Sequence, residues 1–264
     1  MKKFIALTMA LAMVFTLASC GKKDEGPNNE SGITTVESGK LIMSTNASFP
    51  PYEMIADDGS FEGIDVEVAG KIAEKLGLEL QIDDMGFDAS LQAAQTGKSD
   101  MVMAGVTVNE DRLEVMDFSN TYANGVQVVI VKEGSSIATP DDLVNANMIG
   151  CQMGTTGYIF CSDTPENGGF GEDHVTPYED GAAAVQALLK DQVDAVVIDN
   201  LPAQAYVEAN PGLKILEGEF ANEKYAIGVA KGNTQLLDAI NGALEELTAD
   251  GTIQEIVDKY INAD

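Results

Sequence analysis

Residues 104–119 read AGVTVNEDRLEVMDFS and contain Arg112, the only arginine of the chain. The whole chain has 43 Asp and Glu residues against 15 Lys and Arg residues, and a formal net charge of −28. A single guanidinium beside Gly105 and Thr107, in so acidic a chain, is typical of a site that holds an anion through two parallel hydrogen bonds. The alternative is a surface ion pair on a helix, because acidic residues lie on both sides of Arg112.

The position of Arg112 in the expected local structure favours the anion site. Residues 101–104 predict a buried strand, and Asn109 predicts the N-cap of a helix whose first turn holds Glu110 and Asp111. Arg112 then lies in the same first turn, where the helix dipole does not favour a cation. We therefore expect Arg112 to have a functional role at the edge of a sheet.

Working outward, strand-like and helix-like segments alternate from residue 40 to the end of the chain. This alternation predicts an α/β fold with mainly parallel sheets, and about 225 residues are enough for one large or two ordinary domains. The expected strands are residues 41–43, 78–82, 101–104, 148–151 and 194–198, and the expected helices are residues 65–76, 88–96, 181–190, 202–209 and 235–260.

Polar residues follow several of these strands, at the end where open α/β sheets bind their ligands. Residues 44–52 follow the first strand, and a Gly-Thr-Thr-Gly turn at 154–157 follows the strand 148–151, so its backbone N–H groups can face an anion. Asp199 ends the strand 194–198. It can either cap the next helix or receive an ammonium group.

The N-terminus predicts export. Lys2 and Lys3 precede an apolar run that is too short to span a membrane, and small residues follow it. Residues 17–20, Leu-Ala-Ser-Cys, resemble the lipobox of bacterial lipoproteins, so we expect a signal peptide at 1–19, a lipid on Cys20 and a flexible tether over 20–39. The alternative is an ordinary secretory signal.

The net negative charge argues against some classes of binding partner. Loss of Lys2 and Lys3 with the signal brings the net charge near −30, which argues against nucleic acid and against electrostatic adhesion to anionic lipid. The sequence has no cluster of His, Cys and carboxylates at metal-ligand spacing. We expect no cofactor and no metal, and assign His174 no role.

Several motifs, in their order and spacing, resemble the polar amino-acid family of extracellular solute-binding proteins that serve ABC importers. The resemblance covers the chain from residue 40 to 260. The motifs are TNASFPPYE (45–53), FEGIDVEVAGKIAEKLG (61–77), LQAAQTGKSDMVMAGVTVNEDR (91–112), MDFSNTY (116–122), GCQMGTTG (150–157) and AVVIDNLPAQAYV (195–207).

The resemblance implies the fold of that family. It is a two-lobed, periplasmic-binding-protein-like fold of type II, with two mixed sheets flanked by helices and a two-strand hinge. Lobe 1 would comprise residues 40–123 and 221–264, and lobe 2 would comprise residues 124–220. The protein would be a monomer that closes on its ligand and is recognised by an ABC permease in the cytoplasmic membrane.

The resemblance also implies how a free amino acid would be held. Arg112 would bind the ligand α-carboxylate with help from Thr107, Thr155 and Thr156. Asp199 and the carbonyl of Gly105 would receive the α-ammonium. Phe49 and Phe87 would enclose the ligand side chain, the alternative being that these rings are ordinary core residues.

Asn46 and Gln152 occupy variable pocket positions of the family. Asn46 replaces an acid that several members carry, so the two neutral amides favour a polar uncharged ligand side chain and leave a basic one open. An enzyme of the cyclohexadienyl-dehydratase type would need a further acid or base, for which Glu53 and Asp88 are available. A ligand-sensing surface receptor would use the same binding site.

Cys151 and Cys161 remain once Cys20 carries a lipid. In an exported protein, a pair at this spacing either forms a disulfide or remains as two buried thiols. The sequence alone leaves both alternatives open, because it does not give the separation of the two residues.

Overall fold

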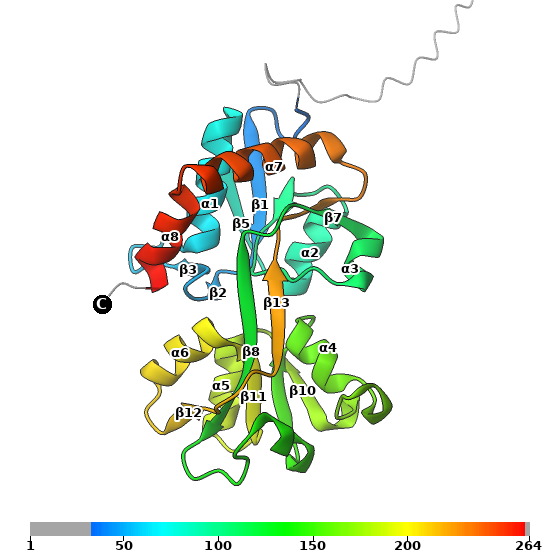
Figure 1. The fold of residues 1–264 in the computed structure, drawn as a ribbon, viewed down its shortest axis with the longest axis vertical. Coiled ribbons are helices and arrows are strands. Elements are labelled where there is room, and N and C mark those ends of the chain that lie inside the picture. The colour runs from blue at the N-terminus through cyan, green and yellow to red at the C-terminus, as the bar shows by residue number, and fades with distance from the viewer. Residues whose placement is uncertain (1–32, 262–264) are drawn as a thin grey trace, which may run out of the picture.

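The computed structural model describes residues 33–261, so the predicted signal peptide and Cys20 lie outside the described residues. The chain forms two lobes, each with a mixed sheet flanked by helices (Figure 1). This confirms the predicted fold class. No helix in the described part of the chain is long and apolar enough to cross a membrane.

The first lobe is built on a sheet in the order β5-β1-β6-β14-β7. Its strands are β1 (Lys40–Thr45), β5 (Glu79–Asp84), β6 (Met101–Val102), β7 (Met116–Phe118) and β14 (Gly228–Ala230). β1 runs parallel to β5 and β6, whereas β14 is antiparallel to β6 and β7. A small antiparallel sheet of β2 (Ser48–Phe49), β3 (Glu53–Ile55) and β4 (Phe61–Glu62) follows β1.

Helices cover the sheet of lobe 1 with apolar faces that recur at helical spacing. They are α1 (Ile64–Leu76), α2 (Phe87–Gln95), α3 (Glu110–Val115), α7 (Thr234–Ala249) and α8 (Thr252–Ile261). On α1, Val68 and Ile72 are fully buried, and Gly77 ends the helix in a left-handed conformation with φ of 67° that favours glycine. On α7, Leu236, Ile240 and Leu247 complete the same core.

The second lobe is built on a sheet in the order β10-β9-β11-β8-β12, and β13 also pairs with β8. Its strands are β8 (Ala123–Lys132), β9 (Ile149–Gln152), β10 (Val175–Tyr178), β11 (Ala195–Asp199), β12 (Leu213–Ile215) and β13 (Ala221–Tyr225). Its helices are η1 (Pro140–Asn145), α4 (Thr156–Ser162), η2 (Pro165–Asn167), η3 (Glu172–His174), α5 (Gly181–Leu189) and α6 (Asn200–Ala209). Nearly continuous apolar runs such as Ala195–Ile198 bury both faces of the sheet.

Two antiparallel strands, β8 and β13, run side by side between the lobes (Figure 1). The lobe boundaries expected from the sequence, at residues 123 and 221, coincide with the first residues of these strands. Gly125 on β8 lies against the hydroxyl of Tyr225 on β13, where a Cβ atom would be only 2.1 Å from that oxygen. Glycine is therefore needed at this point of the connection.

The predicted tether is too long at its C-terminal end. Ile33 is 5% exposed and belongs to the core of lobe 1, and the N–H of Val36 donates to the carboxylate of Asp100 at 2.7 Å. Residues 33–39 therefore pack on lobe 1 instead of forming part of a tether that runs to residue 39. The physical reason is the burial of one apolar side chain in an otherwise polar segment.

Candidate functional site

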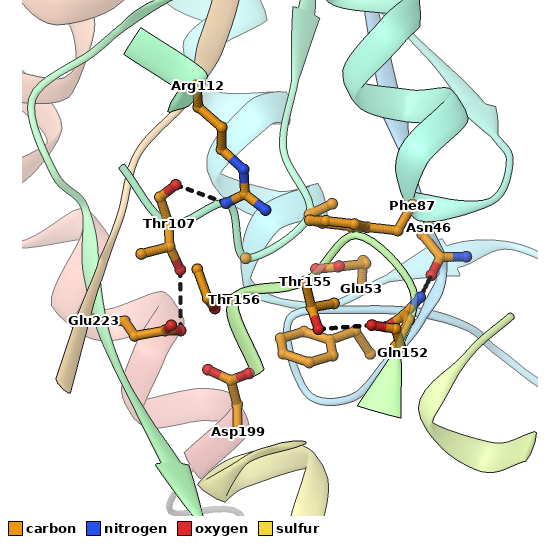
Figure 2. A pocket seen from close by; sticks show the side chains of 13 residues that line it. Asn46, Glu53, Phe87, Thr107, Arg112, Gln152, Thr155, Thr156, Asp199 and Glu223 are labelled. Carbon is orange, nitrogen blue, oxygen red and sulfur yellow. Dashed lines mark hydrogen bonds between the residues drawn. The ribbon is translucent and has the colours of Figure 1, made fainter. Parts of the chain in front are cut away.

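One pocket between the lobes brings together every ligand-binding residue expected from the sequence (Figure 2). The empty space at this pocket, part of which is open to solvent, is about 330 Å³. The residues are Asn46, Phe49, Phe87, Gly105, Thr107, Arg112, Gln152, Thr155, Thr156 and Asp199. Three further residues that were not expected as ligand contacts also line it: Glu53, Ala104 and Glu223.

Arg112 is held by the start of α3. Asn109 is the N-cap of this helix, as predicted, and its side chain accepts a hydrogen bond from the backbone N–H of Arg112 at 2.9 Å. The guanidinium donates to the carbonyl of Thr107 at 2.7 Å and, across the cleft, to the carbonyl of Gly154 at 3.1 Å. It also lies over the ring of Phe87, with 5.4 Å between Cζ and the ring centroid.

Arg112 is a buried cation without an anionic partner. It is only 7% exposed, and none of the ion pairs formed by residues 33–261 includes it. Burial lowers the pKa of the guanidinium from its usual value. An arginine does not release its proton under these conditions. The charges of Glu223 and Asp88 favour the charged guanidinium, but neither carboxylate forms an ion pair with it, so the guanidinium can still bind an anion directly.

Asp199 lies at the end of β11, in the N-cap position of α6, but its side chain makes no capping hydrogen bond. Its carboxylate instead accepts hydrogen bonds from the hydroxyl of Tyr225 and, at 2.6 Å, from the amide of Gln127. Burial, followed by the nearby charge of Glu223, raises the pKa of Asp199 well above its usual value. The capping alternative is thus not what the structure shows.

Glu223, on β13, was missed in the sequence. It is 5% exposed and accepts hydrogen bonds from the hydroxyl of Thr107 at 3.0 Å and from the amide of Gln127 at 3.2 Å. The available signal was period-two alternation, because Glu223 and Tyr225 point to the same buried face of their strand. A carboxylate buried at such a position needs polar groups nearby that can hydrogen-bond to it.

Glu53, on β3, was considered only as a catalytic acid or base. It is 1% exposed, and neither carboxylate oxygen has a hydrogen-bond partner among the described residues. The acid with the largest effect on Glu53 is Asp65, whose carboxylate accepts from the N–H of Gly105 at 3.0 Å. Burial, and then the charge of Asp65, raise the pKa of Glu53 well above its usual value.

The two aromatic residues line the pocket, as expected. Phe49 stacks on Tyr52 with 5.7 Å between ring centroids, and Phe87 is 7% exposed beneath the Arg112 guanidinium. Gly105 has a φ of 54°, and a Cβ atom there would lie 2.8 Å from the ring of Phe49. The absence of a side chain at Gly105 therefore lets this ring approach the backbone.

Several contacts join the two lobes across the pocket. The amide of Gln152 donates to the side-chain oxygen of Asn46 at 2.8 Å, and the hydroxyl of Tyr206 donates to the carbonyl of Ser48 at 2.8 Å. Gly154, with a φ of 77°, lies so close to Asp88 that a Cβ atom would be 1.7 Å from its carboxylate. The lobes are therefore in the closed arrangement.

The Gly-Thr-Thr-Gly turn starts a helix, as predicted. Thr155 is the N-cap of α4: its hydroxyl accepts from the N–H of Tyr158 at 3.3 Å and donates to the carbonyl of Gln152 at 2.8 Å. Thr156 is 4% exposed and faces the same pocket. The hydroxyl of Thr155 is thus already used by the local structure, and its backbone N–H also donates to the carbonyl of Gln152, at 3.4 Å.

Cys151 and Cys161 are both free thiols and both buried. A thiol hydrogen bond with Cys161, followed by burial, raises the pKa of Cys151 well above its usual value. Of the two alternatives, the structure shows the pair of buried thiols and no disulfide. In residues 33–261, no three His, Cys, Asp or Glu residues are placed to hold a metal ion.

Comparison with known proteins agrees with this geometry. Residues 41–263 match the sequence profile of the bacterial extracellular solute-binding proteins, family 3. The chain belongs to this family. A probable histidine-binding protein of Neisseria gonorrhoeae is 30% identical over 98% of this chain and 96% of its own length.

Two further members support the assignment. The L-cystine-binding protein TcyJ of Escherichia coli K12 is 31% identical over 97% of this chain and 94% of its own length. A solved ancestral arginine-binding protein bound to arginine is 40% identical, with a TM-score of 0.78 over 84% of this chain and 98% of that chain. The predicted family and its two-lobed fold are confirmed, and membership indicates an exported protein.

Proposed function

We propose that this family 3 protein binds a free amino acid between its lobes and delivers it to the permease of an ABC importer. The observation that carries the proposal is Arg112, a buried cation without an anionic partner that faces a pocket of about 330 Å³. The α-carboxylate of an amino acid would supply that partner. The relatives that are named for histidine, cystine and arginine support the same class of ligand.

The other contacts fit the two charges of a zwitterion. Thr107, Thr155 and Thr156 lie in the pocket with Arg112 and would complete the carboxylate site. Asp199 and Gly105 line the same pocket. The Asp199 carboxylate would accept the α-ammonium, with the carbonyl of Gly105 as a second acceptor. Phe49 and Phe87 would flank the ligand side chain.

Closure follows from the division of these groups between the lobes. Arg112 lies on lobe 1, and Asp199 and Thr156 lie on lobe 2. A ligand that contacts both lobes binds the closed form more tightly than the open form, and its binding therefore shifts the population to the closed form. The interlobe hydrogen bonds from Gln152 to Asn46 and from Tyr206 to Ser48 further stabilise the closed form.

Location and partners belong to the same proposal. A signal peptide at 1–19 and a lipid on Cys20 would hold the protein at the outer face of the membrane, where a permease is within reach. The segment between Cys20 and Ile33 would be the tether. We propose that the protein works as a monomer and carries no cofactor.

A dehydratase remains an alternative because Glu53 and Asp88 lie at the pocket or its edge. A dehydratase would convert its ligand, whereas a binding protein would release it unchanged. Recovering the bound molecule intact after long incubation supports the binding protein. A sensor would use the same site and would be recognised by its protein partner.

The first test is a thermal-shift screen of the purified protein, freed of carried-over ligand, against the proteinogenic amino acids and cystine. A ligand at 100 times its dissociation constant adds about 2.7 kcal/mol to the free energy of unfolding. The matched control is the α-carboxamide of each hit, which lacks the carboxylate and should give little shift. No shift with any amino acid, on folded protein, contradicts the proposed function.

A further inference from the structure

Cys151 and Cys161 carry two nucleophilic groups that the proposed function does not use. Cys151 lies on β9 and Cys161 on α4, and both are fully buried. They belong to one core cluster of lobe 2, where α4 packs against β9. The thiol of Cys151 is hydrogen-bonded to that of Cys161. The structure therefore holds the two thiols in contact, in their reduced form.

The chain between the two cysteines is the turn that faces the ligand pocket. Gln152 directly follows Cys151, and Thr155 and Thr156 lie where α4 begins. All three of these polar residues line the pocket. A bond between the two sulfur atoms would therefore close a covalent ring, residues 151–161, that contains the turn.

Contact between two thiols on neighbouring elements is what a disulfide requires. Cysteines that the backbone holds far apart cannot be bridged unless the backbone moves. The compartment also suits a disulfide, because the family of this chain is extracellular and disulfides form and persist outside the cytoplasm.

Burial determines when the two thiols can react. The thiolate is the nucleophile, and a hydrogen bond with Cys161, followed by burial, raises the pKa of Cys151, so the folded protein holds little thiolate there. However, α4 has only 7 residues, and Ile159 and Phe160 on it are 37% and 43% exposed. A short helix that is buried on one side opens at a lower free energy than the whole lobe. The pair should therefore react during folding or when α4 opens.

We propose that Cys151 and Cys161 are an oxidation site, at which a disulfide reagent of the cell envelope produces a disulfide that joins β9 to α4 and stabilises lobe 2. The reagent is a small-molecule disulfide or the disulfide of an oxidoreductase. One cysteine thiolate attacks it, forms a mixed disulfide and releases one thiolate. The second cysteine thiolate attacks the mixed disulfide and displaces the other. The protein loses two protons and two electrons, and the reagent becomes two thiols.

The first test is refolding of the full chain, reduced and unfolded in urea, in a buffer of reduced and oxidised glutathione. The remaining thiols are then alkylated, and the folded monomer is digested with chymotrypsin. Cleavage after Tyr158 or Phe160 separates Cys151 from Cys161, so their disulfide appears as two linked peptides in the mass spectrum. Peptides also distinguish this bond from any bond to Cys20, the third cysteine of the chain.

Thermal unfolding measures what the bond does to lobe 2. We expect the oxidised protein to melt at least about 5 °C above the protein reduced with dithiothreitol, because the bond restricts the unfolded chain. The double variant Cys151→Ala, Cys161→Ala is the control, and its melting temperature should not depend on dithiothreitol. The comparison of oxidised and reduced unmodified protein stands alone if the double variant does not fold.

The bond should also affect the pocket, and this effect rests on the proposed function. A ring that fixes Thr155 and Thr156 before the ligand arrives lowers the cost of ordering them. Calorimetric titration with the amino acid found in the screen should therefore give at least about threefold tighter binding to the oxidised form than to the reduced form. Equal affinities would contradict this effect.

The outcomes separate the two proposals. Alkylation of both Cys151 and Cys161 after refolding, a bond of either to Cys20 or to a second chain, or an unchanged melting temperature overturns this inference and leaves the proposed function intact. No binding of any amino acid by folded protein overturns the proposed function, whereas the linked peptides and the melting temperature still test the disulfide.

Discussion

The two ends of the pocket hold opposite charges in different ways. At the Arg112 end, a buried guanidinium is fixed by the carbonyls of Thr107 and Gly154 and has no anionic partner among the described residues. At the Glu53 end, a buried carboxyl has no donor and faces a second acid, Asp65. An arginine cannot become neutral here, whereas a carboxyl group can by taking up a proton.

This difference separates what the site requires from what it selects. An anion is favoured at the Arg112 end because the nearby carboxylates of Glu223 and Asp88 form no ion pair with the guanidinium. At the Glu53 end, burial and the charge of Asp65 raise the pKa of Glu53 and so favour its neutral form, and that end can distinguish one ligand side chain from another. Affinity should therefore depend most on Arg112, and specificity most on Glu53.

Removing Arg112 should have the largest effect. Arg112→Ala takes away one partner of a buried charge pair, and we expect ligand binding to weaken by about 2–5 kcal/mol in calorimetric titration. The control is Lys71→Ala, which removes the same charge from an exposed ion pair with Glu74. Equal affinities of Arg112→Ala and the unmodified protein would contradict the proposal that Arg112 binds the ligand carboxylate.

The approach of the two lobes near Arg112 also depends on Gly154. Gly154→Ala places a Cβ atom 1.7 Å from the carboxylate of Asp88, so either this side chain or the lobes must shift, and we expect ligand binding to weaken by about 1–3 kcal/mol. Gly134→Ala is the control, since Gly134 has a similar φ of 81° and no neighbour within 4 Å. Adding Asp88→Ala should restore part of the loss, and a lack of any restoration would contradict the steric cause.

The acids at the Glu53 end should appear in the pH dependence of stability. Burial raises the pKa of Asp65 from 3.8 to about 6. The folded protein then binds more protons than the unfolded chain between about pH 4 and 6, so the free energy of unfolding falls as pH rises through that window, by up to about 1.4 kcal/mol per pH unit. Glu53, whose pKa is also raised, acts in the same direction.

Urea unfolding of the ligand-free protein at several pH values measures this slope. The measurements are made in high salt, because salt screens the general repulsion within a chain of net charge −28. Asp65→Asn keeps an acceptor for the N–H of Gly105 but cannot titrate, so its slope should be shallower. Parallel curves for the two proteins would show that Asp65 is not responsible.

The smallest expected effect is at the contact between the lobes near the Glu53 end. Asn46→Ala removes the acceptor of Gln152, a neutral hydrogen bond that forms only when the lobes are closed, and should weaken ligand binding by about 0.5–1.5 kcal/mol. Asn167→Ala removes an exposed amide that bonds to Asp163 within lobe 2 and should leave binding unchanged. A larger loss, with a change of ligand preference, would instead show that Asn46 contacts the ligand.

The fold could be predicted because apolar periodicity and motif order are local properties of the sequence. Asn109 as an N-cap and the start of α4 at Thr155 follow the same logic. Ile33 could not be placed, since its neighbours are polar and only contact with the core of lobe 1 orders it. That contact depends on tertiary structure.

The sequence predicted most of the residues that line the pocket, but not the hydrogen bonds between them. The motifs place Asn46 and Gln152 in the pocket, but their mutual hydrogen bond joins residues that are far apart in the chain and depends on how the lobes meet. The unpartnered state of Glu53 is equally invisible in the sequence, because it is defined by the absence of donors from several elements. The resemblance identified ten of the thirteen residues that line the pocket. Only the three-dimensional arrangement shows which of their charged groups have partners.

The segment 46–53 also has a consequence for the evolution of this protein. Asn46, Phe49 and Glu53, which line the half of the pocket that we propose for the ligand side chain, lie on this one short segment, whereas Arg112 and Asp199 come from distant parts of the chain. Substitutions within a few neighbouring codons can therefore change the ligand preference, while the contacts proposed for the α-carboxylate and α-ammonium stay unchanged. A gene duplication followed by changes in this segment would suffice to give a cell a second uptake system.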